Sequence, residues 1–378
     1  MSTGVAILGS TGSIGSSTLR VLQRQKEHFH VVALTAYGAA DLVLEQAKSV
    51  EAKLVGVVTG GSNGRRPSGV HCSGPECLIE AATHPDVDIV VNAVVGAAGL
   101  EATLSALKCR KRVALANKET LVMAGDLVLE TARGYGGEVV PVDSEHSAVL
   151  QCVTGRPELD LARLILTASG GPFREWSAER VRQATVAEAL KHPTWQMGRK
   201  ITVDSASLVN KALEVIEAHH LFGLGYESID VVVHPQSIVH AFTEFVDGSV
   251  LAQVGSPNME LPILYALTHP ARLEDSAIPR FDPVKEGHLT FEPLRKDAFP
   301  AFSLGVEAGR VGGTAPAVFN AANEVAVQAF LDGRIEFGRL PEVIGRVLQQ
   351  HTATPAHDLA AILGADRWAR QRTGAECC

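Results

Sequence analysis

A series of short apolar runs, rich in β-branched residues, alternates with helical stretches between Val5 and Val142, and no other feature constrains the fold as strongly. Such alternation predicts βαβ units, in which successive strands are parallel and a helix forms each crossover. The runs are apolar enough to be covered on both faces, as strands inside a parallel sheet are. Ligands of such a sheet bind beyond the carboxyl ends of its strands. The predicted strands are Val5-Gly9, His30-Ala36, Leu54-Val58, Asp88-Val95, Arg112-Ala116 and Glu138-Val142.

The pattern of the chain changes after Val142, and 378 residues exceed what one hydrophobic core usually organises. Longer helical segments interleave there with predicted strands at 162–166, 229–233 and 250–254, which indicates a second, α+β domain. Further helices are expected at Phe302-Arg310, Ala315-Leu331, Arg339-His351 and Ala356-Arg372. The predicted division is a parallel-sheet domain at 1–143, an α+β domain at 144–269, a Pro- and acid-rich surface linker at 270–293, and a helical domain at 294–378.

The amino-acid composition and charge of the chain argue against several classes of protein. Hydrophobic residues make up 46% of the chain and charged residues 20%, which is far from the signature of disorder. A net charge of -8 without a dense Lys/Arg run argues against nucleic acid as a partner. No stretch approaches the roughly 18 apolar residues of a membrane span, and no signal segment precedes the first predicted strand. Because the six cysteines form no CxxC pair, we expect free thiols in a soluble, cytoplasmic protein.

A glycine-rich turn, Gly9-Ser10-Thr11-Gly12-Ser13-Ile14-Gly15, follows the first predicted strand and opens a helix. Glycines there let a pyrophosphate approach backbone N–H groups at the positive helix end. The spacing is GxxGxxG, so the turn alone also fits a tight connection without a ligand. The second predicted strand ends in Thr35-Ala36-Tyr37-Gly38, without the carboxylate that binds the ribose 2′-hydroxyl of NAD, and the nearest acid, Asp41, is expected in the next helix. This favours NADP, although no Arg or Lys stands at the turn.

Acidic residues follow the last strand of the predicted parallel sheet, in Asp143-Ser144-Glu145-His146. Two carboxylates at the carboxyl end of a strand form a cradle for a hard cation such as Mg²⁺ or Mn²⁺, which keeps open positions for substrate oxygens. The same tetrad fits an acidic turn that caps the next helix. The residues alone leave both interpretations open.

A single helix is predicted over 203–214, and Asn210 and Lys211 share one face of it with Glu214. That face suits a phosphate and a metal together, and Ser205, near the predicted helix start, adds a hydroxyl where an anion binds well. The alternative is a Lys211–Glu214 surface pair with Ser205 as the N-cap.

Irregular segments at 168–173 and 192–198 are marked by glycine or proline. A loop near 190–200 that carries His192 and Trp195 is suited to close over a substrate and exclude water. The alternative is that Trp195 packs against the core and His192 is solvated.

Eight segments occur in an order and spacing that point to one family: GSTGSIG, LANKE, VDSEHSA, SGGPF, HPTWQMGRK, DSASLVNKALEVIEA, HPQSIVH and NAANEVAV. In them the chain resembles the 1-deoxy-D-xylulose 5-phosphate reductoisomerases over nearly its whole length. The resemblance implies an α/β protein with an N-terminal Rossmann-like NADPH domain, a central α+β catalytic domain and a C-terminal helical domain, in a homodimer. It implies NADPH- and divalent-metal-dependent (Mg²⁺, Mn²⁺ or Co²⁺) isomerisation and reduction of this small sugar phosphate to 2-C-methyl-D-erythritol 4-phosphate, in non-mevalonate isoprenoid synthesis.

Residue roles carried over from the family are also implied by the resemblance. The metal ligands would be Asp143, Glu145 and Glu214, and Lys118 and His192 would act beside them in catalysis. Substrate contacts would come from Ser144, Ser169, His192, Trp195, Ser205, Asn210 and Lys211. Cofactor contacts would come from Thr11, Gly12, Ser13, Ile14, Gly38, Asn117, Glu119, Met197 and Gly198. The turn at Tyr37 departs from the basic or Asn-containing turn of many members, and backbone N–H groups, Arg65 or Arg66 are the alternatives for the 2′-phosphate.

Two other functions fit parts of the sequence. A different NADP-dependent oxidoreductase, such as a semialdehyde dehydrogenase, needs a reactive cysteine, and Cys152 falls in an apolar helix-like run. A nucleotide-sensing regulator without activity is expected to lose a metal carboxylate, and all three are present.

Overall fold

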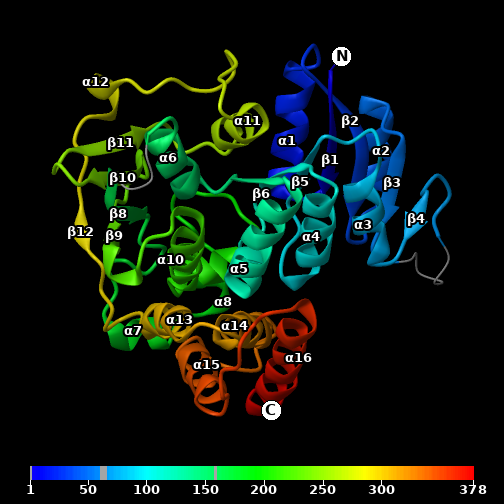
Figure 1. The fold of residues 1–378 in the computed structure, drawn as a ribbon. Helices are drawn as coiled ribbons and strands as arrows, with labels where there is room; N and C mark the ends of the chain where they lie inside the picture. Colours follow the sequence, from blue (N-terminus) through cyan, green and yellow to red (C-terminus); the bar gives the residue numbers. More distant parts are fainter. Residues whose placement is uncertain (1, 60–65, 157–159) are drawn as a thin grey trace. The chain divides into compact units, whose positions relative to one another are not determined.

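The computed structural model describes residues 2–59, 66–156 and 160–378, which form two compact units (Figure 1). Unit 1 comprises Met1–Thr120, Val128–Ser147 and Asn258–Pro279. Unit 2 comprises Leu121–Leu127, Ala148–Pro257 and Arg280–Cys378. Each unit is described by itself. Among the described residues, no helix combines the length and the apolar character needed to cross a membrane.

Unit 1 is built on a seven-stranded parallel sheet with the strand order β4-β3-β2-β1-β5-β6-β7. The order reverses between β1 and β5, which is the topological switch point of a doubly wound sheet. All six predicted strands are confirmed, with ends that shift by a few residues. β4 was not predicted, because two residues are too short to show a period. The strands are β1 Thr3–Leu8, β2 Phe29–Ala36, β3 Leu54–Val57, β4 Cys72–Ser73, β5 Ile89–Asn92, β6 Arg112–Leu115 and β7 Glu138–Pro141.

The helices of unit 1 bury one face and expose charge on the other, as α1 shows. Its Leu19, Val21 and Leu22 are buried, whereas Arg20 and Arg24 lie on the outer face. The predicted Rossmann-like fold is therefore confirmed in this unit. The helices with residues in unit 1 are α1 Ser13–Arg24, α2 Ala40–Val50, α3 Glu76–Thr83, α4 Leu100–Lys108, α5 Lys118–Tyr135, the start of α6 Ser144–Val153, and α11 Glu260–Thr268.

A late segment, Asn258–Pro279, belongs to unit 1, although the sequence predicted that it lies partly in the central domain and partly in a linker. Long-range ion pairs to α1 explain the difference. Arg20 Nε lies 2.7 Å from Glu260 Oε1, and Arg24 Nη2 lies 2.6 Å from Glu260 Oε2 and 2.8 Å from Asp275 Oδ2. The partners are more than 200 residues apart, so no local pattern reveals them. The division of the remainder into three domains stays a prediction.

Unit 2 contains a five-stranded mixed sheet with the order β11-β10-β8-β9-β12. β8 and β9 are parallel, and the other neighbours are antiparallel. The three predicted strands are confirmed. β10 and β12 were not predicted, since β10 is buried at most positions without clean alternation and β12 has two residues. The strands are β8 Leu161–Ala168, β9 Ile229–Val233, β10 Val239–Phe245, β11 Val250–Val254 and β12 Glu292–Pro293.

Helix α14 of unit 2 contributes its buried residues Val318, Phe319 and Phe330 to one hydrophobic core with residues of α9, α10, α13, α15 and α16. The four predicted C-terminal helices are confirmed, because their apolar spacing is long and regular. The helices are α7 Ala178–Arg182, α8 Val186–Ala189, α9 Arg199–Ala206, α10 Val209–Phe222, α12 Pro283–Glu286, α13 Pro300–Val311, α14 Ala315–Leu331, α15 Arg339–Gln349 and α16 Leu359–Glu376.

The prediction of a single helix over residues 203–214 is wrong. α9 ends at Ala206 and α10 starts at Val209, because Leu208 adopts a left-handed conformation with φ of 61°. Asn210 therefore lies in the first turn of α10. Ser205 lies in the last turn of α9, so it is neither near the start of the helix that carries Glu214 nor the N-cap of that helix.

Candidate active site

The glycine-rich turn of unit 1 leaves a helix N-terminus open to an anion. Gly12 precedes α1 with no side chain capping the helix, and the first turn carries no acid. Gly9 has a φ of 84°, and a Cβ on Gly15 would come within 2.3 Å of the Gly9 carbonyl oxygen. The predicted strand, turn and helix are confirmed. Thr11, Gly12, Ser13 and Ile14 line the mouth of this turn, each at least partly exposed.

The turn after β2 carries no carboxylate. Tyr37 is 74% exposed, and its carbonyl accepts hydrogen bonds from Thr59 N at 2.7 Å and Thr59 Oγ1 at 2.8 Å. A Cβ on Gly38 would lie 2.7 Å from Thr59 Oγ1, so the turn is compact here. Asp41 lies in α2, as predicted. Of the two arginines considered for the 2′-phosphate, Arg66 donates to the His71 carbonyl at 2.6 Å, and Arg65 lies outside the described residues.

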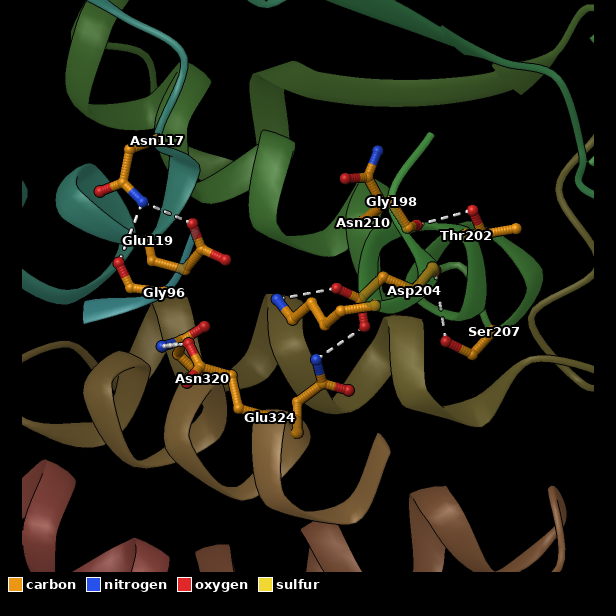
Figure 2. Close-up of polar contacts among 12 residues, drawn as sticks. Gly96, Asn117, Glu119, Gly198, Thr202, Asp204, Ser207, Asn210, Asn320 and Glu324 are labelled. Carbon is orange, nitrogen blue, oxygen red and sulfur yellow. Dashed lines mark hydrogen bonds and ion pairs between the residues drawn. The ribbon is translucent and has the colours of Figure 1, made fainter. Parts of the chain in front are cut away.

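Asn117 lies between β6 and α5, and its buried side chain forms hydrogen bonds with the loop that follows β5. Its Nδ2 donates to the Val94 carbonyl at 2.8 Å. It also donates to the Gly96 carbonyl at 3.0 Å and to Glu119 Oε2 at 2.9 Å (Figure 2). Asn117 is 1% exposed and Glu119 6%. These contacts fix the loop that follows β5 beside the start of α5. Asn117 and Glu119 thus shape the carboxyl edge of the sheet, where a cofactor binds in this fold class.

The acidic cluster lies at the start of α6. Asp143 immediately precedes the helix and its carbonyl accepts from Ser147 N at 2.8 Å, while Glu145 lies in the first turn. The tetrad thus starts a helix and also gathers carboxylates, and the metal site stays a prediction. Lys118 Nζ donates to Asp143 Oδ2, and both side chains are largely buried. Ser144 Oγ donates to Glu145 Oε2 at 2.6 Å.

His146 is a residue of this cluster that the sequence analysis did not assign to the site. It is fully buried, and its Nδ1 lies 3.6 Å from Asp143 Oδ2. The spacing of three residues from Asp143 at a helix start was the available signal.

The second charged cluster lies on α10 in unit 2. Lys211 is 4% exposed and Glu214 is 1% exposed. Lys211 Nζ donates to Glu214 Oε2 and, at 2.5 Å, to the Thr167 carbonyl at the end of β8. Asn210 Nδ2 donates to Glu214 Oε1. The alternative of a solvated Lys211–Glu214 surface pair is therefore wrong, since both side chains are buried.

The loop between α8 and α9 is tied to the end of β8 by His192. Its Nε2 lies 3.0 Å from Ser169 Oγ, while Nδ1 accepts from Thr194 N at 3.1 Å and Trp195 N at 2.8 Å. Burial lowers the pKa of His192 to about 4. The ring is therefore neutral near pH 7, and with Nδ1 accepting, Nε2–H donates to Ser169. The alternative of a solvated His192 is wrong.

Ser169 and Ser205, two of the predicted site residues, lie in the same region of unit 2. Gly170 and Gly171 have φ of 83° and 66°, and a Cβ on Gly171 would lie 2.9 Å from the Ser205 carbonyl oxygen. The backbone of Ser205 therefore lies beside the turn that carries Ser169. Residues 191–198, including Trp195, Met197 and Gly198, have no regular structure, and the predicted irregular segment is confirmed.

Three family models match the chain. The 1-deoxy-D-xylulose 5-phosphate reductoisomerase model matches residues 5–125, that family's C-terminal domain matches 139–222, and the DXP reductoisomerase C-terminal domain matches 254–372. A reductoisomerase of Synechococcus sp. is 49% identical, with 98% of this chain and 96% of the relative covered. The chain belongs to the 1-deoxy-D-xylulose 5-phosphate reductoisomerase family. A second relative, from Heliobacterium modesticaldum, is 48% identical and covers 97% of this chain and 95% of its own length.

Solved reductoisomerases have the same fold. The enzyme of Zymomonas mobilis in complex with NADPH has a TM-score of 0.91 and 39% identity, over 100% of this chain and 99% of that chain. Another, in complex with NADPH, fosmidomycin and magnesium, has a TM-score of 0.92 and 38% identity, over 99% and 98%. The predicted fold class and family are confirmed, and with them the class of NADP-dependent oxidoreductase. The semialdehyde dehydrogenase and regulator alternatives are set aside.

Proposed function

We propose that the chain isomerises and reduces 1-deoxy-D-xylulose 5-phosphate to 2-C-methyl-D-erythritol 4-phosphate with NADPH and Mg²⁺. The observation that carries this proposal is the match to reductoisomerases along nearly the entire chain. Two related structures support the proposal that the chain uses NADPH and Mg²⁺. One is a complex with NADPH, and the other is a complex with NADPH, fosmidomycin and magnesium.

The donor set suits Mg²⁺ or Mn²⁺. Asp143, Glu145 and Glu214 offer only hard carboxylate oxygens, the type that these ions prefer. Glu214 is buried, and its carboxylate already has a positive partner in Lys211. We assign these three residues as the ligands, and Mn²⁺ and Co²⁺ as ions that the same donors accept. When bound, the divalent ion supplies polarisation of the substrate's carbonyl and hydroxyl oxygens.

The cofactor surface suits NADPH. The uncapped start of α1, with Gly12 before it, offers N–H groups to a pyrophosphate, and the turn after β2 has no acid to repel a 2′-phosphate. NADPH supplies the hydride that reduces the rearranged sugar. Asn117 and Glu119 order the loop beside that cofactor, and Gly38, Met197 and Gly198 complete the proposed contacts.

The chain's own residues bind and orient the sugar phosphate. Lys211 places an ammonium at the start of α10, close to the amide of Asn210. Ser169 adds a hydroxyl from the turn after β8, and Ser205 adds one from the last turn of α9. His192, neutral near pH 7, presents an N–H donor rather than a charge. Trp195 on the same loop supplies apolar surface that excludes water from the reaction. Ser144 and Lys118 lie beside the carboxylate cluster, where Lys118 holds a proton near Asp143.

We also propose a cytoplasmic homodimer. The six cysteines are free thiols, which is typical of a reducing compartment. β11 is an edge strand of the unit 2 sheet, and its Val250 and Leu251 are 49% and 37% exposed. An exposed apolar edge of this kind favours pairing with a second copy.

The test is NADPH consumption by the purified protein on addition of the pentulose phosphate with Mg²⁺, followed by mass analysis of the product. We expect consumption that needs the sugar phosphate and stops with excess chelator. Consumption without the sugar phosphate, or a product of unchanged carbon skeleton, would refute the assignment. Sedimentation analysis of the same sample tests the dimer.

A further inference from the structure

The helix that follows the loop of residues 191–198 is held from within unit 2 by one buried carboxylate. Asp204 of α9 is 1% exposed. Lys200 Nζ, from the first turn of α9, lies 2.8 Å from its Oδ2, and Asn323 of α14 donates Nδ2 to its Oδ1 at 2.8 Å. Figure 2 shows Asp204 with dashed lines that mark interactions of its carboxylate. Each carboxylate oxygen thus has a donor, one near the loop and one in the helical core.

This arrangement is costly to break. A buried carboxylate that loses a donor keeps its desolvation penalty, so Asp204 holds both Lys200 and α14 in place. Asn323 is itself 1% exposed and cannot exchange its bond for one to bulk water. The position of α9 against α14 is therefore set by a polar contact of fixed geometry as well as by apolar packing.

The fixed helix also fixes the last residue of the loop. The Gly198 carbonyl accepts from Thr202 N at 3.1 Å and from Thr202 Oγ1 at 2.8 Å. A continuous series of contacts therefore runs from Asn323 through Asp204 and α9 to Gly198. The other end of the loop is held separately, by His192 on Ser169.

We propose that Asn323 is a positioning residue for the loop of residues 191–198, acting through Asp204. It fixes the C-terminal end of the loop on the helical core, as the contact of His192 with Ser169 fixes the other end. Only the segment between these ends, with Trp195 and Met197, then needs to be ordered when the loop covers the sugar phosphate. This reduces the conformational entropy lost on closure. The kinetic part of the proposal rests on the proposed function, whereas the anchoring part does not.

The matched control lies on the same helix. Asn320 is fully buried, and its Nδ2 donates to Glu324 Oε1 at 3.0 Å and to the sulfur of Met123 at 3.5 Å, not to α9. Asn320→Ala and Asn323→Ala remove the same group from the same helix. Both variants share any general weakening of α14. Only Asn323→Ala also removes the hydrogen bond to α9.

The anchoring is tested on the full-length protein by limited trypsin digestion, with cleavage after Lys191, Arg199 and Lys200 followed by mass spectrometry. We expect Asn323→Ala to be cut there about tenfold faster than the wild type, because local opening becomes easier, and Asn320→Ala to be cut at close to the wild-type rate. Equal rates in Asn323→Ala and the wild type, or equal acceleration in both variants, would overturn the proposal.

A swap tests the hydrogen bond itself. In the double variant Asp204→Asn/Asn323→Asp, the new amide can donate to the new carboxylate while its oxygen accepts from Lys200. We expect the double variant to regain most of the resistance to trypsin. A double variant cut as fast as Asn323→Ala would show that the bond does not anchor the loop.

The positioning role is tested by kinetics. We expect Asn323→Ala to raise the Michaelis constant for the sugar phosphate about tenfold, as misplaced binding groups do. Faster cleavage with an unchanged Michaelis constant would refute positioning. A failure of the proposed function is distinguishable, because the wild type itself would then consume no NADPH with this substrate.

Discussion

Replacement of Lys211 by methionine tests the assignment of the α10 face most directly. Lys211→Met keeps the length and the apolar stem of the side chain and removes only the ammonium. In the structure this ammonium is 4% exposed and donates to Glu214 and to the Thr167 carbonyl. If the sugar phosphate binds here, the variant loses a charge-assisted contact to a dianion.

The magnitude follows from burial and charge. Hydrogen bonds to charged groups contribute about 1.5 to 3 kcal/mol, so the Michaelis constant for the sugar phosphate should rise roughly 10- to 150-fold. The turnover number should also fall, because phosphate binding energy orients the reacting carbons. NADPH binding should be unchanged, since the charge serves the substrate.

The same substitution weakens unit 2 itself. Removing one partner of a buried ion pair costs about 3 to 5 kcal/mol, and the lower end applies because Glu214 keeps the donor of Asn210. Urea unfolding followed by tryptophan fluorescence measures this loss, because Trp176, Trp195 and Trp368 all lie in unit 2. The variant is then assayed only where it is folded.

The control is Lys285→Met, which removes the same charge from a side chain that is 83% exposed in unit 2. We expect wild-type kinetics and stability from it. The assay is steady-state NADPH consumption at varied sugar phosphate, with a separate fluorescence titration of NADPH. An unchanged Michaelis constant in Lys211→Met, or a loss of NADPH affinity, would refute the assignment of this face to the substrate phosphate.

The remaining predictions concern the metal, the cofactor and pH. Excess chelator, Glu145→Gln and Glu214→Gln should each reduce NADPH consumption nearly to background, because a hard cation loses a carboxylate; near-normal turnover in either variant would remove that residue from the ligand set. Catalytic efficiency should be higher with NADPH than with NADH, and the reverse order would mean that the turn after β2 selects against the 2′-phosphate. Burial lowers the pKa of His220 to about 4, so the unfolded chain binds the proton more readily, and the free energy of unfolding of unit 2 should fall as pH drops from about 6.5 to about 4. Urea titrations across this range should show a shallower fall for His220→Gln, and an identical pH dependence would exclude His220 as the cause.

The parts of the fold that the sequence predicted correctly are those that depend on interactions between residues close together in the chain. The turn at residues 9–15 follows from glycines whose neighbours leave no space for a Cβ, and a strand before it and a helix after it complete a local unit. α14 follows from a long apolar period that one core buries on several sides. In both cases the determining contacts lie within a few residues or repeat along one element.

The differences arise where contacts between distant residues decide the structure. Nothing local in the sequence marks Leu208 as left-handed, because leucine is a common helix former, and the break between α9 and α10 was therefore missed. The ion pairs of Arg24 with Glu260 and Asp275 join segments more than 200 residues apart. They place Asn258–Pro279 in unit 1, although the sequence predicted that this segment lies partly in the central domain and partly in a linker.

The candidate site shows the same limit on a smaller scale. Spacing alone identified Asn210, Lys211 and Glu214 as one face, since these residues lie within one turn of a helix. It did not reveal that Lys211 also reaches the Thr167 carbonyl, 44 residues earlier, or that Asn323 holds Asp204. Those contacts turn an exposed pair into a buried cluster, which is why the surface alternative could not be excluded earlier.

Two of the proposed metal carboxylates are paired with a lysine of their own unit. Asp143 pairs with Lys118 in unit 1, and Glu214 pairs with Lys211 in unit 2. A lysine offsets the cost of burying a carboxylate, so each unit can fold with its charges balanced. A divalent cation held by the same oxygens would compete with the ammonium, because both seek the same lone pairs. Lys211, if displaced from Glu214, would then be available to the phosphate of the substrate. Metal and sugar phosphate should therefore bind with positive coupling, and by linkage each should increase the affinity for the other by the same factor.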